Sequence, residues 1–579
     1  MRSLPENRKL YAGYALQVLA IIVLVFIQVQ ADLSLPDYMS KIVDQGIVLG
    51  NNSVIFQQGI YMIVFAFLSA ACTLGVCFLA AKVGSGVSRL LRRKTFEKVE
   101  SFSMAEFDKF SASTLITRST NDIQQIQLML ILFLRMFISA PMTGVGAVIK
   151  AIDKGRGLTW IMIVTVSTIA ALVVALFIAV IPKFTKLQQL VDRLNLVTSE
   201  NLTGLRVVRA YNTEAVEEKK FDAASGDLMK VQLFVNRMMS MMFPLMMIIM
   251  NLTSVSIVWV GSHMINQGTL QIGAMMAFIQ YTMQVIMSFL MLTMVFVMAP
   301  RAAVSIRRVA EVLNTKAGLP EPERFTESDP GARGLVEFKN VAFKYPDADD
   351  SVLENISFTA NPGETTAFIG STGSGKSTLI NLIPRMYDVT GGAVLVDGVD
   401  VRDCSKEALC GKLGYVPQKG VLFSGTVESN IKFGIDEASY RDMRDAAKTA
   451  QASEFIDKMD KGFDSVIAQG GQNVSGGQRQ RLSIARALVR KPEIYIFDDS
   501  FSALDFKTDA ALRRALAEDT DGATVLIVAQ RISTIIGAEK IVVLDKGRIV
   551  GIGTHAELIK NCGVYKEIAM SQFSEEELA

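Results

Sequence analysis

The sequence of 579 residues contains few of the residue types that bind metals or form disulfides. Its five cysteines include no CxxC pair, which disfavours a zinc site or a disulfide framework, and only two histidines occur, His263 and His555. Lysine and arginine (59) nearly balance aspartate and glutamate (57), so no overall positive field points to nucleic acid as a partner. Only 20% of the residues are charged and 50% are hydrophobic, which is too apolar for a soluble or a disordered protein. The excess apolar surface is expected to face lipid.

All the long apolar runs lie before about residue 300. Each of the six is long enough for the roughly 20 residues that cross a hydrocarbon core; they are 14–37, 55–81, 128–150, 158–182, 240–264 and 273–299. The first run ends in small residues that resemble the cleavage site of a signal peptide. Cleavage is not expected, because the run is longer than the apolar part of a signal peptide and its removal would leave an odd number of spans. The sequence therefore predicts six spanning helices.

The distribution of lysine and arginine predicts the orientation of the spans. The N-terminus and the segments 82–127 and 183–239 carry 20 of these residues, whereas the connections 38–54, 150–157 and 265–272 carry four. Because lysine and arginine are enriched in cytoplasmic loops, the long basic segments are expected to be cytosolic helical extensions of the spans. Both chain ends would lie on that same side.

Two features of the spans bear on the compounds that the protein could carry. A row of methionines at helical spacing in the sixth span suits a cavity for varied apolar compounds, but lipid contact or helix packing explains it equally well; the row is Met283, Met287, Met291, Met294 and Met298. Arg135 in the third span is better explained by snorkelling or bundle packing than by contact with cargo. The spans show no paired charges, which favours hydrophobic or amphipathic compounds over ions.

The composition changes after Pro300. Residues 314–335 are rich in proline, glycine and charge, which predicts a linker. Beyond it, short β-branched runs alternate with turns and helical stretches, which predicts an α/β domain over residues 336–572 and an acidic tail over 573–579. Residues 1–313 would form the membrane domain.

A phosphate-binding motif, GSTGSGKS, follows the strand-like run Thr366–Ile369 and opens a helix-like run. Glycines allow a tight loop whose N–H groups point at phosphate oxygens, Lys376 would reach the β- and γ-phosphates, and Ser377 would bind Mg²⁺. A second Mg²⁺ ligand is expected in Asp498, at the end of the apolar strand that starts at Ile494. The residues expected to hold the nucleotide here are Gly370, Ser371, Thr372, Gly373, Ser374, Gly375, Lys376, Ser377 and Thr378.

The stretch Asn473–Arg481, NVSGGQRQR, resembles the signature sequence of ABC-type ATPases. Gly204–Tyr211 and Thr117–Asp122 are similar to segments of the intracellular loops of ABC exporters with six spans per subunit. The resemblance therefore covers the whole chain. It implies a six-helix transmembrane domain of the ABC exporter type followed by an α/β P-loop nucleotide-binding domain, with ATP and Mg²⁺ as cofactors and ATP hydrolysis coupled to transport.

Further residue roles follow from the resemblance alone. Two subunits would dimerise and hold each ATP between the phosphate loop of one and the signature of the other. Tyr345 would stack on adenine, and Gln418 would contact Mg²⁺ and sense the membrane domain. The loop that ends in Asp505 would link the two ATP sites. The signature residues in contact with nucleotide would be Ser475, Gly476, Gly477 and Gln478.

The chain departs from the family pattern at two positions. Asp499 stands where the family has its hydrolytic glutamate, and a carboxylate misplaced by about 1 Å can lower the rate on the order of 100-fold. Gln530 stands where the family has a histidine, and a neutral amide is a weaker contact for the γ-phosphate. Asp499, Gln530 and Gln418 are therefore the candidate catalytic residues of an impaired site.

Two losses beside an intact signature suggest asymmetry. We expect this chain to be the degenerate-site half of a heterodimeric bacterial multidrug-type exporter of hydrophobic or amphipathic compounds. It would lie in the cell membrane with its ATPase domain in the cytosol, and its partners would be a second half-transporter, the bilayer and the cargo. Three alternatives stay open: Asp499 serves as an adequate base, the protein is a homodimeric lipid or drug flippase with slow sites, or it is an ATP-gated regulator that does not pump.

Overall fold

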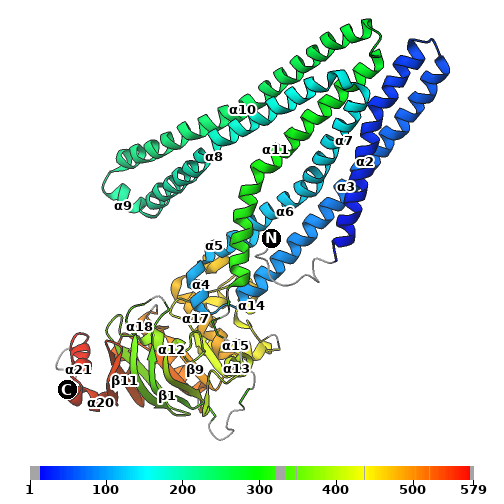
Figure 1. Ribbon diagram of the computed structural model, residues 1–579. Coiled ribbons are helices and arrows are strands. Elements are labelled where there is room, and N and C mark those ends of the chain that lie inside the picture. The colour runs from blue at the N-terminus through cyan, green and yellow to red at the C-terminus, as the bar shows by residue number, and fades with distance from the viewer. Residues whose placement is uncertain are drawn as a thin grey trace. The chain divides into compact units, whose positions relative to one another are not determined.

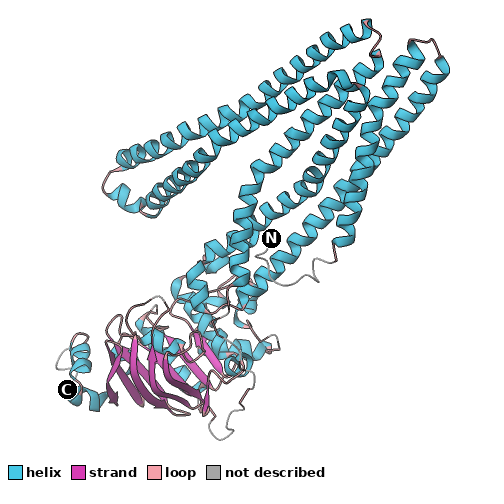
Figure 2. Ribbon diagram, in the orientation of Figure 1, coloured by secondary structure: helices cyan, strands magenta, loops and turns pink. Residues whose placement is uncertain are grey.

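The chain folds into two compact units in this computed structural model, which describes residues 13–573 except 317, 320, 321, 323, 324, 327–332, 347, 436, 503 and 521. One unit comprises Met1–Glu100 and Ser113–Thr315, and the other comprises Ser101–Ala112 and Lys316–Ala579. The first is helical, and the second combines strands with helices (Figure 2). Much of the predicted linker 314–335, and residues 574–579 of the predicted tail, lie outside the described residues.

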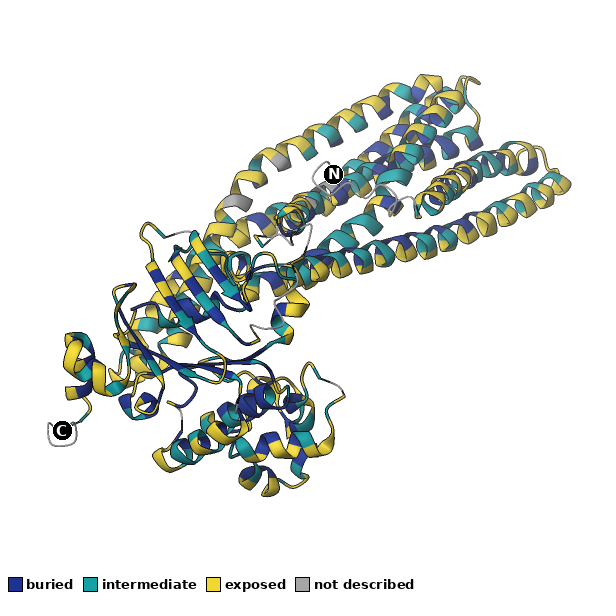
Figure 3. Cartoon of the chain, turned by 90° about the horizontal axis from the view of Figure 1, so that it is seen from below, coloured by how far each residue is buried: buried dark blue, intermediate teal, exposed yellow. Residues whose placement is uncertain are grey.

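Six helices of the described chain are long and apolar enough to cross a membrane. Much of their apolar surface is exposed, because at most 38% of the most apolar window of any of them is buried; Figure 3 shows the exposed residues along them. Outward-facing apolar side chains are what a lipid environment requires. The six predicted spans are confirmed, and the helical segments are Ala15–Ile47, Asn52–Glu100, Ala112–Lys154, Arg156–Thr203, Glu214–Asn266 and Ile272–Asn314.

Several of these segments change helical pitch along their length. The third contains two π-turns, and π-turns are often found at functional positions. In the first of these turns Asp122 is buried and accepts a 2.7 Å hydrogen bond from Ser305 Oγ. The elements of this unit are α2 (Ala15–Lys41), η1 (Ile42–Ile47), α3 (Asn52–Glu100), α5 (Ala112–Thr117), η2 (Arg118–Asp122), α6 (Ile123–Leu132), η3 (Phe133–Phe137), α7 (Ile138–Lys154), η4 (Arg156–Leu158), α8 (Thr159–Thr203), α9 (Leu205–Ala210), α10 (Glu214–Asn266) and α11 (Ile272–Asn314).

Helices α8 and α10 pack against each other, and α9 joins them at the end far from α11 (Figure 1). Within the apolar part the pair is linked by the hydroxyls of Thr165 and Thr253, 2.9 Å apart. Exposed apolar side chains lie at the α9 end of the pair, among them Leu202 on α8, Val207 on α9 and Phe221 on α10. We refer to residues 183–239 as the α8–α10 arm.

The prediction that the spans hold no paired charges is wrong at one place. Lys150 Nζ lies 2.7 Å from Oδ2 of Asp37, and Lys154 Nζ lies 3.3 Å from the other carboxylate oxygen. Asp37 and Lys150 are 113 positions apart in the chain, so only the packing of α2 against α7 reveals the pair. Asp32, one turn earlier on α2, accepts a 2.5 Å hydrogen bond from Ser69 Oγ. The charge of Asp37 is therefore neutralised locally where α2 and α7 meet.

The second unit is built on a six-stranded sheet in the order β12-β11-β3-β10-β9-β6, parallel except at β12. Helices and a second sheet cover its two faces, so β9 and β10 are buried at every residue, as expected of a parallel sheet enclosed on both sides. The six strands are β12 (Arg548–Gly553), β11 (Lys540–Asp545), β3 (Thr365–Gly370), β10 (Thr524–Val528), β9 (Ile494–Asp498) and β6 (Leu413–Val416).

Two smaller sheets and a set of helices complete this unit. An antiparallel sheet has the order β2-β1-β4-β5, and β7 pairs with β8. Its remaining elements are β1 (Val336–Phe343), β2 (Leu353–Ala360), β4 (Gly391–Val396), β5 (Val399–Asp400), β7 (Gly425–Thr426), β8 (Val466–Ile467), α4 (Met104–Phe110), α12 (Lys376–Asn381), α13 (Lys406–Gly411), α14 (Val427–Ile431), α15 (Tyr440–Thr449), α16 (Ser453–Asp457), η5 (Gly462–Asp464), η6 (Gln469–Gly471), α17 (Gly476–Leu488), α18 (Phe506–Asp519), α19 (Ile532–Ile535), α20 (His555–Asn561) and α21 (Gly563–Met570).

Helix α4 belongs to this second unit although the helices before and after it in the chain belong to the first. A capping box starts it, in which the Ser103 backbone N–H donates to Glu106 at 2.8 Å. It ends at Ser111, whose φ of +57° stops the helix. This short helix lies in the chain between α3 and α5 and packs with the second unit.

Candidate nucleotide site

Four of the predicted site segments follow neighbouring parallel strands. The phosphate loop follows β3, Gln530 follows β10, Asp499 follows β9 and Gln418 follows β6. These strands are adjacent in the order β3-β10-β9-β6, and the carboxyl ends of parallel strands meet at one edge, where ligands bind in open α/β sheets. The topology therefore gathers at one edge residues that are up to 160 positions apart.

The phosphate loop runs from Gly370 to Gly375 and leads into α12. Gly375 has φ +95°, and a Cβ added there would lie 2.6 Å from Leu353, so this position requires glycine. The Lys376 ammonium reaches back over the loop to the carbonyl oxygens of Gly370 (2.9 Å) and Ser371 (2.8 Å). Burial lowers the pKa of Lys376, against the opposing effect of Asp499 and Asp498. An anion in the loop would relieve that unfavourable burial of positive charge.

Ser377 and Asp498 form a pair of oxygen ligands suitable for Mg²⁺. Ser377 Oγ donates a 2.9 Å hydrogen bond to Oδ1 of Asp498, so the hydroxyl and the carboxylate already lie together. Burial raises the pKa of the Asp498 carboxyl, and the neighbouring Asp499 raises it further. Hard oxygen ligands and an excess of buried negative charge fit a divalent cation, which would neutralise the γ-phosphate and the carboxylate together when ATP is bound.

Asp499 sits at the end of β9 with φ +45° and is 7% exposed. Its Oδ2 accepts hydrogen bonds from two side-chain amides, Gln530 Nε2 at 2.7 Å and Gln418 Nε2 at 3.4 Å. Burial raises the pKa of Asp499, while these two amides and Ser502 oppose the rise. Asp499 therefore contacts both of the other candidate catalytic residues. A carboxylate oxygen occupied by two amide donors has less capacity left to accept a proton from water.

Tyr345 follows β1 and is partly buried beside the phosphate loop. Its hydroxyl lies 3.0 Å from Thr378 Oγ1, the third residue of α12. Its ring makes an edge contact with Phe343, with centroids 4.9 Å apart. The structure thus places the aromatic residue predicted to stack on adenine next to the helix that would bind the phosphates.

The signature residues form the start of α17. Ser475 caps the helix, accepting from Gln478 N at 3.3 Å, and Gln478 accepts from Ser475 N at 2.9 Å. Ser475 and Gly476 are exposed, so the N-terminus of a 13-residue helix faces solvent. None of the hydrogen bonds found among the described residues joins this helix start to the phosphate loop. Asp505, at the start of α18, likewise acts within its own helix as the acceptor of Thr508 N at 3.0 Å.

Sequence reasoning missed a second aromatic residue at this site. Tyr387 packs its ring edge-on against Tyr345, with centroids 5.3 Å apart and planes at 87°. Its hydroxyl donates a 3.0 Å hydrogen bond to Asp108 of α4. Tyr387 and Asp108 are 279 positions apart, and no pattern in the sequence links the two residues.

Comparison with known proteins identifies both parts of the chain. Residues 18–289 match the family described as ABC transporter transmembrane region, and residues 353–502 match the family described as ABC transporter. A solved structure described as a bacterial Atm1-family ABC exporter with ATP bound superposes with a TM-score of 0.81 at 25% identity, covering 96% of this chain and 98% of that one. The predicted fold class is confirmed.

Relatives match along almost the whole chain. An ABC transporter ATP-binding protein of Mycobacterium tuberculosis is 41% identical over 562 residues, 96% of each chain. A protein of Syntrophus aciditrophicus named ATP-dependent lipid A-core flippase is 31% identical over 535 residues, covering 89% of this chain and 86% of that protein. The chain therefore belongs to the ABC transporter family, as an exporter-type half-transporter in which the membrane and ATPase domains are fused and ATP hydrolysis drives transport.

Proposed function

We propose that this chain is the degenerate-site half of a heterodimeric bacterial exporter of hydrophobic or amphipathic compounds. Its own phosphate loop holds Mg·ATP with little turnover. Its signature, which includes Ser475 and Gly477, completes the competent site on a partner that carries a glutamate and a histidine at the positions of Asp499 and Gln530. The membrane part lies in the cell membrane with the ATPase domain in the cytosol.

The contact between Gln530 and Asp499 carries this proposal. A general base must have a free oxygen within hydrogen-bond reach of the water that it activates. The 2.7 Å hydrogen bond from Gln530, together with the shorter side chain of aspartate, holds Oδ2 back at the end of β9. A glutamine cannot exchange a proton, so the pair lacks the acid–base function of a carboxylate and a histidine.

Assembly with a second chain is supported by two exposed surfaces. The N-terminus of α17 presents backbone N–H groups and a partial positive charge that suit a phosphate. The α8–α10 arm carries exposed apolar side chains outside the most apolar part of its helices. Apolar surface of this kind on a cytosolic segment is characteristic of an interaction site. In the proposed dimer, ATP bound between the two chains contacts the N-terminus of α17. The partner chain covers the apolar side chains of the α8–α10 arm.

The cargo assignment rests on the apolar character of the spans. Met287, Met291 and Met294 are exposed on α11, where flexible thioethers can contact varied apolar compounds. The paired Asp37 and Lys150 leave little net charge for binding an ion. Hydrophobic and amphipathic compounds are therefore the proposed cargo.

A homodimeric lipid flippase is the second candidate function. It is favoured by the similarity to the Syntrophus aciditrophicus protein, whose name states lipid A-core flipping. In this case Asp499 would be the base at two identical slow sites, and this chain alone would hydrolyse ATP and move lipid. A third candidate, an ATP-gated regulator, would change conformation with ATP but would move no compound.

A vesicle assay separates these three functions. Inverted membrane vesicles would carry this chain alone or together with the product of the neighbouring gene, and ATP-dependent uptake of a lipophilic cationic dye and of a fluorescent phospholipid would be followed. The proposed heterodimer requires uptake only when both chains are present. Lipid movement by this chain alone would establish the homodimer, and a conformational response to ATP with no uptake of either probe would establish the regulator.

A further inference from the structure

The side chain of Gln572, just after α21, holds the backbone of the segment that carries Gln530. Its Nε2 donates a 2.8 Å hydrogen bond to the backbone oxygen of Gln530, and its Oε1 accepts one of 2.8 Å from the backbone N–H of Ile532. Both ends of one planar amide are therefore used on the two peptide groups that flank Arg531. Because Gln572 is 42 and 40 positions from these partners, the contact joins the last part of the described chain to the nucleotide edge of the large sheet.

Helix α21 fixes the place from which Gln572 reaches this segment. Tyr565 and Ala569 of the helix are fully buried, and the Tyr565 hydroxyl lies 2.7 Å from Nδ1 of His555. On the other side of Gln572, Phe573 packs against the same hydrophobic core as Tyr565 and Ala569. Gln572 is therefore supported by packed side chains both before and after it in the chain.

The segment after β10 has little support of its own. Helix α19 has only four residues, and Arg531 at its N-cap makes no side-chain capping bond. A short helix of this kind is marginally stable, and its first N–H groups need partners from outside. Gln572 supplies the acceptor for the N–H of Ile532, and Arg513 Nη1 donates to the backbone oxygen of Ser533 at 2.6 Å. Side chains from elsewhere in the unit therefore hold this segment in place.

Hydrogen bonds, and not packing, decide where the Gln530 side chain points. Gln530 is exposed, whereas every residue of β10 before it is buried. On one side of it, Ala529 N donates to the backbone oxygen of Phe368 at 3.1 Å, and on the other side Gln572 holds its carbonyl oxygen. The side chain that leaves this fixed backbone reaches Oδ2 of Asp499 at 2.7 Å. Loss of the Gln572 contact would leave Gln530 anchored on one side only.

We propose that Gln572 is a positioning residue that aims Gln530 at the γ-phosphate position of this chain's own site and thereby strengthens the preference of that site for ATP over ADP. The inference rests on the proposed function in one respect, that this phosphate loop holds ATP. The loop follows β3 and Gln530 follows the neighbouring strand β10, so a side-chain amide there can donate to the terminal phosphate. A hydrogen bond to a charged oxygen changes affinity by about tenfold or more, and ADP lacks that phosphate.

The test separates recognition of the γ-phosphate from occupancy of the site. The full chain would be used in nanodiscs with its partner, on ice, and photolabelling of this chain by 8-azido-ATP would report occupancy of its own site. Unlabelled Mg·ATP and Mg·ADP would compete with the label, and the ratio of their half-inhibitory concentrations gives the preference for ATP. Damage to the rest of the site would weaken both competitors equally and leave this ratio unchanged. In the wild type, Mg·ATP is expected to compete about tenfold better than Mg·ADP.

Gln572→Ala removes both hydrogen bonds and is expected to lower the ATP-over-ADP ratio by about threefold or more. Gln572→Glu keeps an acceptor for Ile532 N but places a carboxylate oxygen against the carbonyl of Gln530, so it should lower the ratio at least as much. Gln530→Ala should cause a loss of its own. Adding Gln572→Ala to Gln530→Ala should lower the ratio no further, because Gln572 acts only through Gln530.

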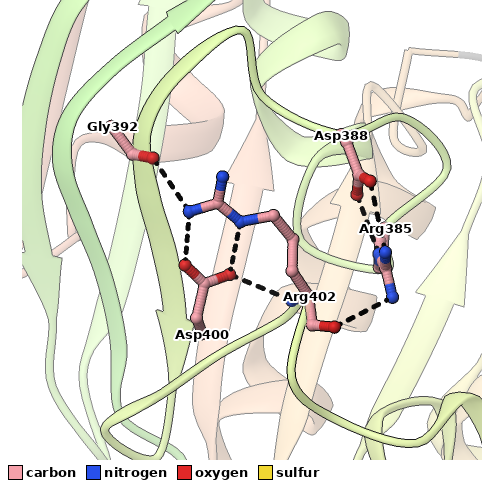
Figure 4. Close-up of polar contacts among 5 residues, drawn as sticks. All are labelled: Arg385, Asp388, Gly392, Asp400 and Arg402. Carbon is pink, nitrogen blue, oxygen red and sulfur yellow. Dashed lines mark hydrogen bonds and ion pairs between the residues drawn. The ribbon is translucent and has the colours of Figure 1, made fainter. Parts of the chain in front are cut away.

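Two control variants remove comparable contacts away from the Gln530 segment. Arg402 Nη2 donates to the backbone oxygen of Gly392 at 3.1 Å and pairs with Asp400 at 2.6 Å (Figure 4). Arg402→Ala therefore removes a side-chain bond to the backbone and an ion pair from the same unit. Ser571→Ala removes the 2.7 Å hydrogen bond to the backbone oxygen of Ile568, next to Gln572 in the chain. Both variants should keep the wild-type ratio.

Three results would overturn the inference while leaving the proposed function intact. The first is a wild-type ratio that Gln572→Ala leaves unchanged or that Arg402→Ala lowers equally. The second is a further loss when Gln572→Ala is added to Gln530→Ala, because Gln572 would then act by another route. The third is equal competition by Mg·ATP and Mg·ADP in the wild type. A wild-type chain that 8-azido-ATP does not label would refute the proposed function and the inference with it, since this phosphate loop would hold no ATP.

Discussion

Gln530 Nε2 lies 2.7 Å from Oδ2 of Asp499, and this hydrogen bond joins the ends of two adjacent strands, β10 and β9. The two residues stand at the positions where a base and its histidine partner are expected from the family resemblance. An amide in place of an imidazole turns an acid–base pair into a static hydrogen bond. According to the proposed asymmetry, this hydrogen bond fixes the position of Asp499 without making its carboxylate an effective base.

Replacement of Asp499 by asparagine should have little effect on the turnover of the assembled pair. Asparagine keeps one oxygen that can accept from Gln530 or Gln418, and the removed charge takes no part in hydrolysis according to the proposed asymmetry. Steady-state ATPase activity is expected to stay within about threefold of the wild type. Glutamine in place of the partner's hydrolytic glutamate is the comparison, and it should abolish turnover. A loss of more than about tenfold in Asp499→Asn would assign hydrolysis to this site.

The ATPase activity of the pair should be far more sensitive to substitutions in the signature than to substitution of Asp499. Ser475→Ala removes the hydroxyl at the start of α17 and Gly477→Glu places a negative charge beside the phosphate that the helix would bind. Each is expected to abolish the ATPase activity of the pair, since one lost donor to a transition-state anion alone costs on the order of 100-fold.

Loss of a helix cap alone could also weaken the protein, by about 1 kcal/mol. Ser439→Ala controls for this effect, because Ser439 caps α15 with the same box arrangement and accepts from Asp442 N at 3.1 Å. ATPase activity after Ser439→Ala should remain near the wild-type rate. Equal losses at Ser439 and Ser475 would show that the cap, and not contact with nucleotide, explains the defect.

Asp498→Asn should stabilise the nucleotide-free protein at neutral pH. The pKa of Asp498 is raised by burial, so its ionised form opposes folding above that pKa, and the penalty disappears as the pH falls through it toward the unfolded value. Thermal unfolding should show a higher Tm for the variant at pH 7.5, and the difference should shrink as the pH is lowered. The Asp498→Asn variant should also no longer be stabilised by Mg·ATP, because it lacks one of the proposed Mg²⁺ ligands.

Asp505 supplies the control with the opposite sign. Its pKa is lowered by hydrogen bonds from the backbone and side chain of Thr508, so its charge favours folding at neutral pH. Asp505→Asn should therefore lower the Tm at pH 7.5, and this deficit should shrink at acidic pH. A common direction of change in both variants would contradict the assignment of the Asp498 penalty to burial.

Local sequence patterns were sufficient to predict the spans and the phosphate loop. Apolar runs of spanning length and a glycine loop between a strand and a helix are each contiguous in the chain. Each can therefore be predicted from a short stretch of sequence without knowledge of the rest of the fold. Gln418, Asp499 and Gln530 were identified as catalytic candidates through the resemblance to ABC exporters, and the strand order of the sheet then shows that they lie at one edge. Their mutual hydrogen bonds could not, because the rotamers of three side chains on different loops decide them.

Contacts between segments that are far apart in the chain could not be predicted from the sequence. Asp37 and Lys150 pair only because α2 and α7 pack together, and the two residues lie near the ends of predicted spans, where charge is unremarkable. Tyr387 and Asp108 belong to different segments of the chain that the fold of the second unit brings together. Both pairs depend on helix packing, which no local periodicity encodes.

The ATPase activity of this chain purified alone, compared with that of the chain purified together with the product of the neighbouring gene, tests the asymmetric account most directly. The account predicts no turnover from the chain alone, and turnover with the partner that Gly477→Glu abolishes. Robust hydrolysis by the chain alone would contradict it, because Asp499 held by Gln530 would then suffice as the base.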